Sequence, residues 1–439
     1  MFRRILIANR GEVAERVLRT CRRMGIEAVV AVSEPDAGLA WLAEADGVAS
    51  VGGRGGYLDA DALLTAARDH ACSALHPGWG FLSENALFAT RCEAERVTFI
   101  GPSPGSMRTM GDKQVARETM GRLGMPLIPG SPGNVNTVEE ACAIAATLGY
   151  PVLLKACSGG GGRGMRRVEG PDAMADAFAQ ASAEGQSAFG DGTLYLEKLV
   201  VNGRHVEFQV LGDRHGNLVT LGERECSVQR RHQKLLEESP SPALTPDDRV
   251  RIGAIVAEAC RKAGYYGAGT VEMLRDPSGA LYFMEMNTRL QVEHPVTEAV
   301  TGLDLVELQL RVAANEVVKP VFTTSGHSIE CRVNAEDPSA GFRPAPGRVT
   351  RLVLPQGEGV RVDTHLREGD AISPFYDSMV AKVIVHAADR PAAIARMDAA
   401  LAAMVVEGVP TTIGLQRRIL ADPRFRSGAY DTSFLDGWV

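Results

Sequence analysis

The sequence predicts a protein of mixed α/β and α+β class, beginning with a doubly wound α/β domain. Three observations support this. Strand and helix signals alternate over the first 112 residues, two short strand signals enclose a glycine-dense loop, and strand signals dominate from Ser328 onward. A chain of 439 residues is long enough for about three domains.

The N-terminal part shows the alternation most clearly. Residues 5–8 form an apolar run, bounded by Asn9 and Arg10, that predicts a strand. Residues 13–24 have helical spacing, and Gly25 is suited to end that helix in a left-handed conformation. Alternating strands and helices predict a parallel sheet with helices on its faces. The remaining expected elements are strands at 28–32, 73–75 and 97–100 and helices at 62–70 and 83–95, the last capped by Ser83.

A second segment, residues 126–200, predicts a small lid-like subdomain in which two strands flank the glycine-rich loop. The expected elements are helices at 138–148 and 172–184 and strands at 152–155, 165–168 and 194–197.

The glycine-rich loop between Lys155 and Met165 formally matches G-x-G-x-x-G at Gly159, Gly161 and Gly164. That motif indicates a dinucleotide site only where a helix follows, and here a strand signal follows. A P-loop is excluded because Met165 stands where lysine is required. The pattern favours a hairpin flap whose backbone amides cover phosphate, with a surface hairpin that binds nothing as the alternative.

The most informative run spans residues 282–295. If it is extended, every second side chain shares one face, and that face is wholly polar. Its members are Glu285, Asn287, Arg289, Gln291 and Glu293. An ordinary solvent-exposed strand face would look similar.

Three oxygen donors in this part of the chain predict a magnesium or manganese site. They are Glu285, Asn287 and Glu272, the last on a separate expected strand. Carboxylate and amide oxygens suit such hard cations. Arg289 and Gln291 are suited to hold a small oxyanion.

Glu293 is then a candidate general base beside that anion. A basic cluster at residues 229–234 supplies positive charge, although a solvated basic turn is the alternative. No H-E-x-x-H motif is present, which argues against zinc catalysis.

Composition narrows the class further. The net charge is −7, which disfavours a nucleic-acid partner. Eight scattered cysteines without a Cys-x-x-Cys pair predict reduced thiols. We find no apolar run long enough for a membrane span and no signal peptide, so we expect a cytoplasmic enzyme without a membrane partner.

Taken together, these residues resemble the biotin carboxylases of the ATP-grasp superfamily. The resemblance spans nearly the whole chain, with its motifs in family order. The matching segments are 7–12, 76–85, 110–113, 155–165, 226–234, 285–295 and 330–337.

The resemblance implies an ATP-grasp fold with an N-terminal doubly wound α/β domain and a strand-rich C-terminal biotin carboxylase domain. The implied boundaries are 1–112 for the N-terminal domain, 113–201 for the lid with its glycine flap, 202–325 for the catalytic body and 326–439 for the C-terminal domain.

The resemblance also implies a ligase that activates bicarbonate with ATP to carboxyphosphate and then carboxylates biotin. The implied ATP site comprises Lys113, Lys155, Gly161, Gly162, Met165, Glu197, Lys198, Leu199, Val200, His205, Gln229 and His232. Mg²⁺ or Mn²⁺ would be held by Glu272, Glu285 and Asn287, and bicarbonate by Lys234, Arg289, Gln291 and the Val292 backbone. Glu293 would act as the base, and Arg332 would stabilise the enolate-like biotin.

The implied partners are a biotin carboxyl carrier protein or domain, a carboxyltransferase subunit and a second copy of the chain. A separate carrier is expected because we find no Met-Lys-Met acceptor. The family includes the corresponding subunit of acetyl-CoA carboxylase, which serves fatty acid biosynthesis.

Two departures from the family concern Trp79, where tyrosine is usual, and Arg23, where some members have an acidic residue at their dimer contact. Cys157-Ser158 also replaces a more usual small-residue pair. Three other functions remain alternatives. They are another ATP-grasp carboxylate–amine ligase using an acylphosphate, a non-enzymatic nucleotide-binding protein, and an NAD oxidoreductase, which the missing helix after the glycines disfavours.

Overall fold

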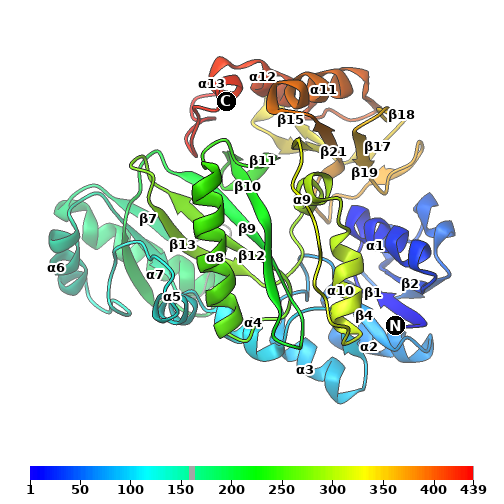
Figure 1. The fold of residues 1–439 in the computed structure, drawn as a ribbon, viewed down its shortest axis with the longest axis horizontal. Coiled ribbons are helices and arrows are strands. Elements are labelled where there is room, and N and C mark those ends of the chain that lie inside the picture. Colours follow the sequence, from blue (N-terminus) through cyan, green and yellow to red (C-terminus); the bar gives the residue numbers. More distant parts are fainter. Residues whose placement is uncertain (158–163, 439) are drawn as a thin grey trace.

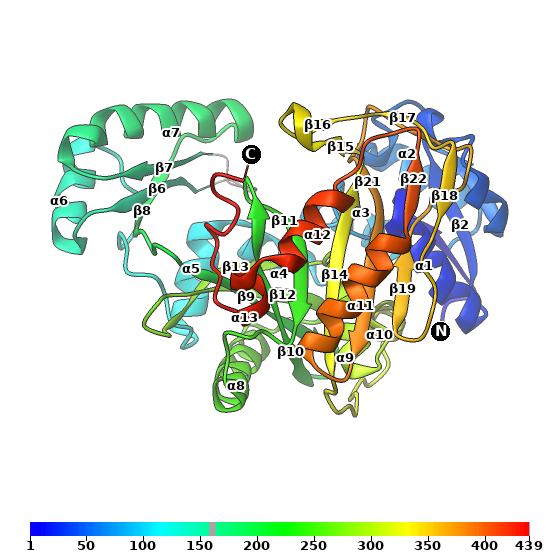
Figure 2. The same cartoon turned by 90° about the horizontal axis from the view of Figure 1, so that it is seen from above.

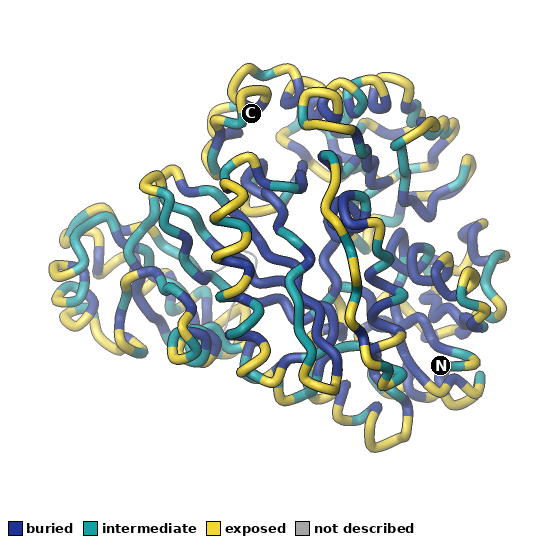
Figure 3. The backbone as a smooth tube through the Cα atoms, in the orientation of Figure 1, coloured by how far each residue is buried: buried dark blue, intermediate teal, exposed yellow. Residues whose placement is uncertain are grey.

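The computed structural model describes residues 1–157 and 164–438. Three bodies surround a common centre: a parallel α/β domain at the N-terminus, a small lid, and a large antiparallel sheet that carries the C-terminal helices (Figures 1 and 2). Buried backbone follows the strands of the large sheet and of the N-terminal domain (Figure 3).

The N-terminal domain contains the predicted parallel sheet, with strand order β3-β2-β1-β4-β5. Ile5 and Ile7 pack into one hydrophobic cluster, whereas Leu6 and Ala8 pack into another. Since neighbouring strand side chains point to opposite faces, both faces of this sheet are covered. The elements are β1 (Arg4–Ile7), α1 (Gly11–Met24), β2 (Glu27–Val32), β3 (Gly47–Ser50), α2 (Ala60–Asp69), β4 (Ala74–His76), α3 (Ala86–Ala94) and β5 (Thr98–Phe99), with short 3₁₀ turns at Glu34–Asp36, Ala40–Glu44 and Gly56–Leu58.

Two local predictions in this domain had different outcomes. Gly25 ends α1 in the left-handed region with φ 68°, as predicted. The prediction that Ser83 caps the next helix is wrong. α3 begins after Asn85, whose side chain accepts a hydrogen bond from the backbone amide of Phe88, and Ser83 is buried in the preceding turn.

The lid is a three-stranded antiparallel sheet in the order β7-β6-β8, with α6 and α7 packed beside it. The pairing of β6 with β7 confirms that a hairpin flanks the glycine loop. The loop glycines, Gly161 and Gly162 included, lie outside the described residues. The elements are α6 (Val138–Leu148), β6 (Val152–Ala156), β7 (Met165–Val168), a 3₁₀ turn (Pro171–Ala173), α7 (Met174–Phe189) and β8 (Leu194–Lys198).

The central sheet has eight strands in the order β13-β12-β9-β10-β11-β14-β21-β19, and every neighbouring pair is antiparallel. It runs without a break from the catalytic body into the C-terminal residues, because β11 pairs with β14. The strands are β9 (Arg204–Gly212), β10 (Leu218–Arg230), β11 (Gln233–Ser239), β12 (Gly267–Arg275), β13 (Leu281–Asn287), β14 (His327–Asn334), β19 (Val360–Asp363) and β21 (Met379–Ala387).

Helices and short ladders surround this sheet. The helices are α4 (Pro104–Gly111), α5 (Lys113–Arg122), α8 (Pro246–Lys262), α9 (His294–Thr301), α10 (Leu305–Ala313), α11 (Arg390–Ala403), α12 (Ile413–Ala421) and α13 (Pro423–Ser427), with a 3₁₀ turn at Pro338–Ala340. The short strands are β15 (Glu336–Asp337), β16 (Arg343–Pro344), β17 (Gly347–Arg348), β18 (Arg351–Val353), β20 (Ala371–Ile372) and β22 (Val405–Glu407).

Within the part of the chain that the structure describes, no helix is both long and apolar enough to cross a membrane. The eight cysteines are free thiols, and seven of them are buried, which confirms the prediction of reduced cysteines.

Candidate active site

A polar pocket of about 410 Å³ lies where the bodies meet. The loop after β4, the lid, the central sheet and the C-terminal strands all contribute side chains to it. Its lining comprises Trp79, Gly80, Lys113, Lys155, Met165, Tyr195, His205, Gln229, His232, Gln233, Lys234, Leu235, Glu272, Met284, Glu285, Asn287, Arg289, Gln291, Val292, Arg332, Asn334, Asp377 and Met379. Fourteen of these were predicted from the sequence as site residues.

Charged side chains form a row across four neighbouring strands, and two of them, Glu272 and Glu285, line the pocket. Glu207 of β9 pairs in register with Arg224 of β10 and with Glu272 of β12, and Glu272 pairs in turn with Glu285 of β13. Arg224 Nε lies 2.5 Å from Glu207 Oε1, and both side chains are fully buried. The arginine therefore holds the first carboxylate of the row.

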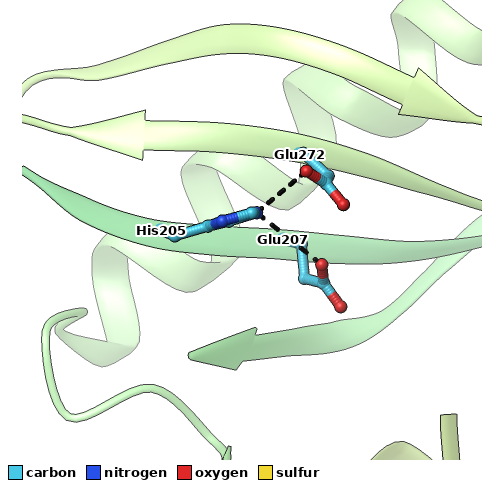
Figure 4. Close-up of side chains that lie close together, drawn as sticks. All are labelled: His205, Glu207 and Glu272. Atoms are coloured by element: carbon cyan, nitrogen blue, oxygen red, sulfur yellow. Dashed lines mark ion pairs between the residues drawn. The ribbon is translucent and has the colours of Figure 1, made fainter. Parts of the chain in front are cut away.

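Figure 4 shows the imidazole of His205 pointing toward the carboxylates of Glu207 and Glu272. His205 Nε2 lies 3.0 Å from Glu272 Oε2. Burial alone would lower the pKa of His205, but Glu272 outweighs it and raises that pKa. Glu272 therefore favours the protonated, positively charged form of the His205 imidazole.

Lys234 joins this row to the predicted base. Its Nζ donates to Glu207 Oε2 at 2.6 Å, Glu272 Oε1 at 3.0 Å and Glu293 Oε1 at 2.6 Å. Burial disfavours the ammonium, but the three carboxylates prevail and raise the pKa of Lys234 well above its usual value. Lys234 is therefore a fixed cation, and the basic cluster is not simply a solvated turn.

Glu293 does not line the pocket. It lies fully buried directly behind the lining, with Oε1 on Lys234 and Oε2 accepting from Arg332 Nη2 at 2.9 Å. Burial alone would raise the pKa of Glu293, but Lys234, Arg332 and Arg224 together hold it well below its usual value. The carboxylate is thus ionised at neutral pH and able to accept a proton.

Arg332 of β14 also forms an ion pair with Glu237, a carboxylate that the sequence analysis did not assign to the site. Burial, only partly offset by Arg332, raises the pKa of Glu237 to about 7. The Arg332 guanidinium therefore bridges two buried carboxylates, and its own pKa is raised because they outweigh the burial that opposes its charge.

The predicted metal ligands lie together. Glu272 and Glu285 are cross-strand neighbours, and Asn287 Nδ2 donates to Glu272 Oε1 at 2.9 Å. Glu285 Oε2 lies 3.2 Å from Lys113 Nζ, and both line the pocket. Two carboxylates and an amide oxygen facing one cavity fit a magnesium ion that also binds substrate phosphates. His205, Glu207 and Glu272 form a second close group, but its buried members are already paired with Lys234 and Arg224.

The polar run is not extended to Glu293, so the prediction of one continuous polar strand face is wrong. β13 ends at Asn287, and the next residue, Thr288, donates its backbone amide to Glu84 Oε1 at 2.8 Å instead of continuing the ladder. The turn still brings side chains together. Arg289 donates to Glu84, Gln291 and Asn287 at 2.8, 2.9 and 3.0 Å.

The predicted ATP residues divide into two sets. Lys113, Lys155, Met165, His205, Gln229 and His232 line the pocket. Glu197 lies behind Lys155, to which it is ion-paired, and it also accepts from Arg117. Lys198 donates to the carbonyl oxygens of Gly149 and Tyr150. Leu199 and Val200, like Glu197 and Lys198, are not among the lining residues, and their role stays a prediction.

The sequence analysis missed Glu207 and Arg224. A signal for Glu207 is present: polar His205, Glu207 and Gln209 alternate with apolar residues along β9, yet all three are buried. Polar side chains on a buried strand face require partners, so this alternation marks an internal charged cluster.

Comparison with known proteins was made for the whole chain. Three family models match: biotin carboxylase, N-terminal domain, over residues 1–107; carbamoyl-phosphate synthase L chain, ATP binding domain, over 112–320; and biotin carboxylase C-terminal domain over 330–437. The biotin carboxylase of Nostoc sp. is 49% identical over 440 residues, covering 99% of this chain and 98% of that protein.

Two solved structures are similar over nearly the full length. The biotin carboxylase domain dimer of Hydrogenobacter thermophilus 2-oxoglutarate carboxylase, in complex with MgADP, ADP and bicarbonate, has a TM-score of 0.96 at 46% identity, covering 99% of this chain and 97% of that one. The Campylobacter jejuni biotin carboxylase complex with β-γ-ATP has a TM-score of 0.97 at 44% identity, covering 99% and 98%.

Proposed function

Because this chain belongs to the biotin carboxylase family, we propose that its pocket carries out the first half-reaction of a biotin-dependent carboxylase. The enzyme is an ATP-dependent ligase. It uses bicarbonate and ATP to carboxylate biotin, with ADP and phosphate as the other products.

One observation supports the assignment most directly: Glu293 lies directly behind the pocket lining, held between Lys234 and Arg332, which both line the pocket. Bicarbonate is a weak nucleophile, so its O–H proton must be removed as its oxygen attacks the γ-phosphorus. Glu293 accepts that proton. Lys234, Arg289 and Gln291 hold the bicarbonate oxygens, and the bond from the γ-phosphorus to ADP breaks to give carboxyphosphate.

Cations must surround the transferring phosphoryl group because negative charge builds on its oxygens. Lys113 and Lys155 also line the pocket and would bind ATP phosphates. Glu272, Glu285 and Asn287 would hold magnesium, which would offset the negative charge of the phosphates. Water must be excluded, since carboxyphosphate hydrolyses readily.

Breakdown of carboxyphosphate, by cleavage of its C–O bond, releases CO₂ and a phosphate anion beside biotin. The phosphate takes the proton from N1 of biotin, and N1 then attacks CO₂. The ureido oxygen of biotin then gains negative charge, and the guanidinium of Arg332 would stabilise it. The same guanidinium contacts Glu293, which supports a carboxylation step next to the base.

The partners follow from this chemistry. We propose that biotin arrives on a separate carrier protein or domain, that a carboxyltransferase subunit passes the carboxyl group to the final acceptor, and that the chain forms a homodimer in the cytoplasm. The biotin carboxylase domain of Hydrogenobacter thermophilus 2-oxoglutarate carboxylase, whose solved structure is a dimer, supports the proposal of a homodimer. The polypeptide has a net charge of −7, so we assign it no nucleic-acid partner.

The rival function, an ATP-grasp carboxylate–amine ligase, is disfavoured because the biotin carboxylase C-terminal model matches residues 330–437. We expect the purified chain with Mg²⁺ to release phosphate from ATP only when bicarbonate is present, and faster when free biotin is added. Phosphate release should be measured with each substrate omitted in turn. A rate indifferent to biotin would contradict the assignment and favour the rival.

A further inference from the structure

The segment Asn9–Glu12, one of the family-like motifs, has no role in the site described above. Its first side chain holds the loop that carries Trp79. Asn9 Nδ2 donates to the carbonyl oxygens of Pro77 at 2.6 Å and Trp79 at 2.8 Å. Gly78 sits between them at φ 63°, and a Cβ there would lie 2.8 Å from Asn9 Nδ2. The motif and the Trp79 loop therefore form one tightly packed unit.

Its last residue, Glu12, lies in the first turn of α1 and is 3% exposed. One carboxylate oxygen, Oε1, accepts from Trp79 Nε1 at 3.1 Å. The other, Oε2, lies 3.0 Å from Nζ of Lys382, which is on β21 and fully buried. An ion pair thus connects the N-terminal domain with the C-terminal strands.

Lys382 also contacts the active site. Its Nζ donates to the carbonyl oxygen of Val292 at 2.9 Å. That carbonyl and the amide of Glu293 form one planar peptide unit. Holding the Val292 carbonyl therefore fixes the orientation of the peptide bond that leads into Glu293, the proposed base.

A buried ammonium is costly unless charge and hydrogen bonds compensate it. Here the Lys382 ammonium contacts the Glu12 carboxylate and the Val292 carbonyl directly, and the buried carboxylates of Glu330 and Asp363 also interact with its charge. The Glu12 carboxylate also accepts from the Trp79 indole. Val292, Trp79 and Arg332 all line the pocket. One buried pair is therefore in direct contact with two parts of the pocket wall that come from distant stretches of the chain.

We propose that Glu12 and Lys382 are positioning residues for carboxylation, and that their ion pair holds the Val292 carbonyl and the Trp79 indole in the geometry that binds bicarbonate. This inference rests on the proposed function. Neither residue touches the reacting atoms. Their contribution is preorganisation: the backbone around Val292 is already oriented before bicarbonate arrives.

The test is the double variant Glu12→Gln/Lys382→Met, which removes both charges and leaves an amide oxygen to accept from Trp79. We expect it to fold, and we expect the KM for bicarbonate to rise roughly 10- to 100-fold, the effect of losing a hydrogen bond from a charged group. The KM for ATP should stay within about twofold, because Lys113 and Lys155, the proposed phosphate ligands, are unchanged. Both constants come from phosphate release at varied substrate concentration.

A matched control is Glu223→Gln/Arg249→Met, the same kind of exchange at an ion pair outside the pocket. There Glu223 is buried, Arg249 is partly buried, and Arg249 Nε lies 2.7 Å from Glu223 Oε1. It should lower thermal stability without changing the KM for bicarbonate. If the first double variant does not fold, the single variant Glu12→Gln is used instead. This variant removes the carboxylate that pairs with Lys382 but keeps an amide oxygen that can accept a hydrogen bond.

A folded variant with the bicarbonate KM and kcat of the wild type would overturn the positioning role. It would leave the proposed function intact. Failure of the proposed function itself would look different, because the wild-type chain would then show no bicarbonate-dependent phosphate release.

Discussion

Replacing Glu293 with glutamine will lower biotin-dependent ATP turnover by roughly 10²–10⁴, the contribution of a positioned general base. Glutamine keeps the size of the side chain and an oxygen for Lys234, but it cannot accept the bicarbonate proton. The KM for ATP should change little, because Lys113 and Lys155, which would bind the phosphates, line the pocket and Glu293 does not. Steady-state phosphate release, with thermal unfolding as a check on folding, measures both quantities.

The matched control is Glu298→Gln. Glu298 is also a buried carboxylate of the α9 region, but it pairs with Arg16 and Arg361 and does not line the pocket. The Glu298→Gln variant should have a lower thermal stability and an unchanged ATP turnover. Near-normal turnover in Glu293→Gln, with the variant folded, would remove Glu293 from its role.

The pH dependence follows from the same contacts. Burial favours the neutral acid, but Lys234 and Arg332 prevail and hold the pKa of Glu293 well below 4.5. A carboxyl with a lowered pKa stabilises the fold above its unfolded value and loses that contribution as the pH falls through its folded value. Because its folded-state pKa lies below this range, Glu293 should stay ionised between pH 5 and 8. Its titration should therefore cause no loss of ATP turnover over that range.

The second large effect is expected for Arg332→Met. Losing a group that stabilises developing negative charge costs roughly 10²–10³ in rate, and here the loss should fall on carboxylation of biotin. Bicarbonate-dependent ATP hydrolysis without biotin should fall by much less, because Lys234 still orients Glu293. The ratio of hydrolysis with and without biotin is the measurement.

Folding of this variant is expected because Glu237, the other partner of Arg332, already has a pKa raised to about 7 by burial. It can take up a proton instead of remaining an unpaired buried anion. The control is Arg204→Met, which makes the same exchange at an arginine that is paired with Glu225 outside the pocket. Equal loss of both hydrolysis rates in Arg332→Met would contradict a specific role toward biotin.

Much of the fold was predictable because local signals coincide with tertiary structure. The first strand, α1 and its terminal Gly25 were all anticipated, since an apolar run, helical spacing and a left-handed glycine are each encoded within a few residues. The cap of α3 shows the limit of such signals. Ser83 and Asn85 are both good caps, and the choice depends on how the preceding turn packs.

The site was predictable by residue type more than by geometry. Glu285 and Asn287 share a strand face as expected, but the contact between Thr288 and Glu84 ends that strand. The pair Glu12–Lys382 was invisible in the sequence, because its members lie near opposite ends of the chain and meet only through the folded sheet. Long-range charge pairing of this kind leaves no local pattern.

The central claim is that bicarbonate oxygen attacks the γ-phosphorus of ATP, and the oxygen atoms report on it directly. Bicarbonate labelled with ¹⁸O should be supplied with ATP, Mg²⁺ and biotin under conditions that limit exchange with water, and the released phosphate analysed by mass. Attack by bicarbonate predicts one labelled oxygen in each phosphate, because the bridging oxygen stays with phosphorus when carboxyphosphate breaks down. Phosphate that carries no label would show that water is the nucleophile and would contradict the account.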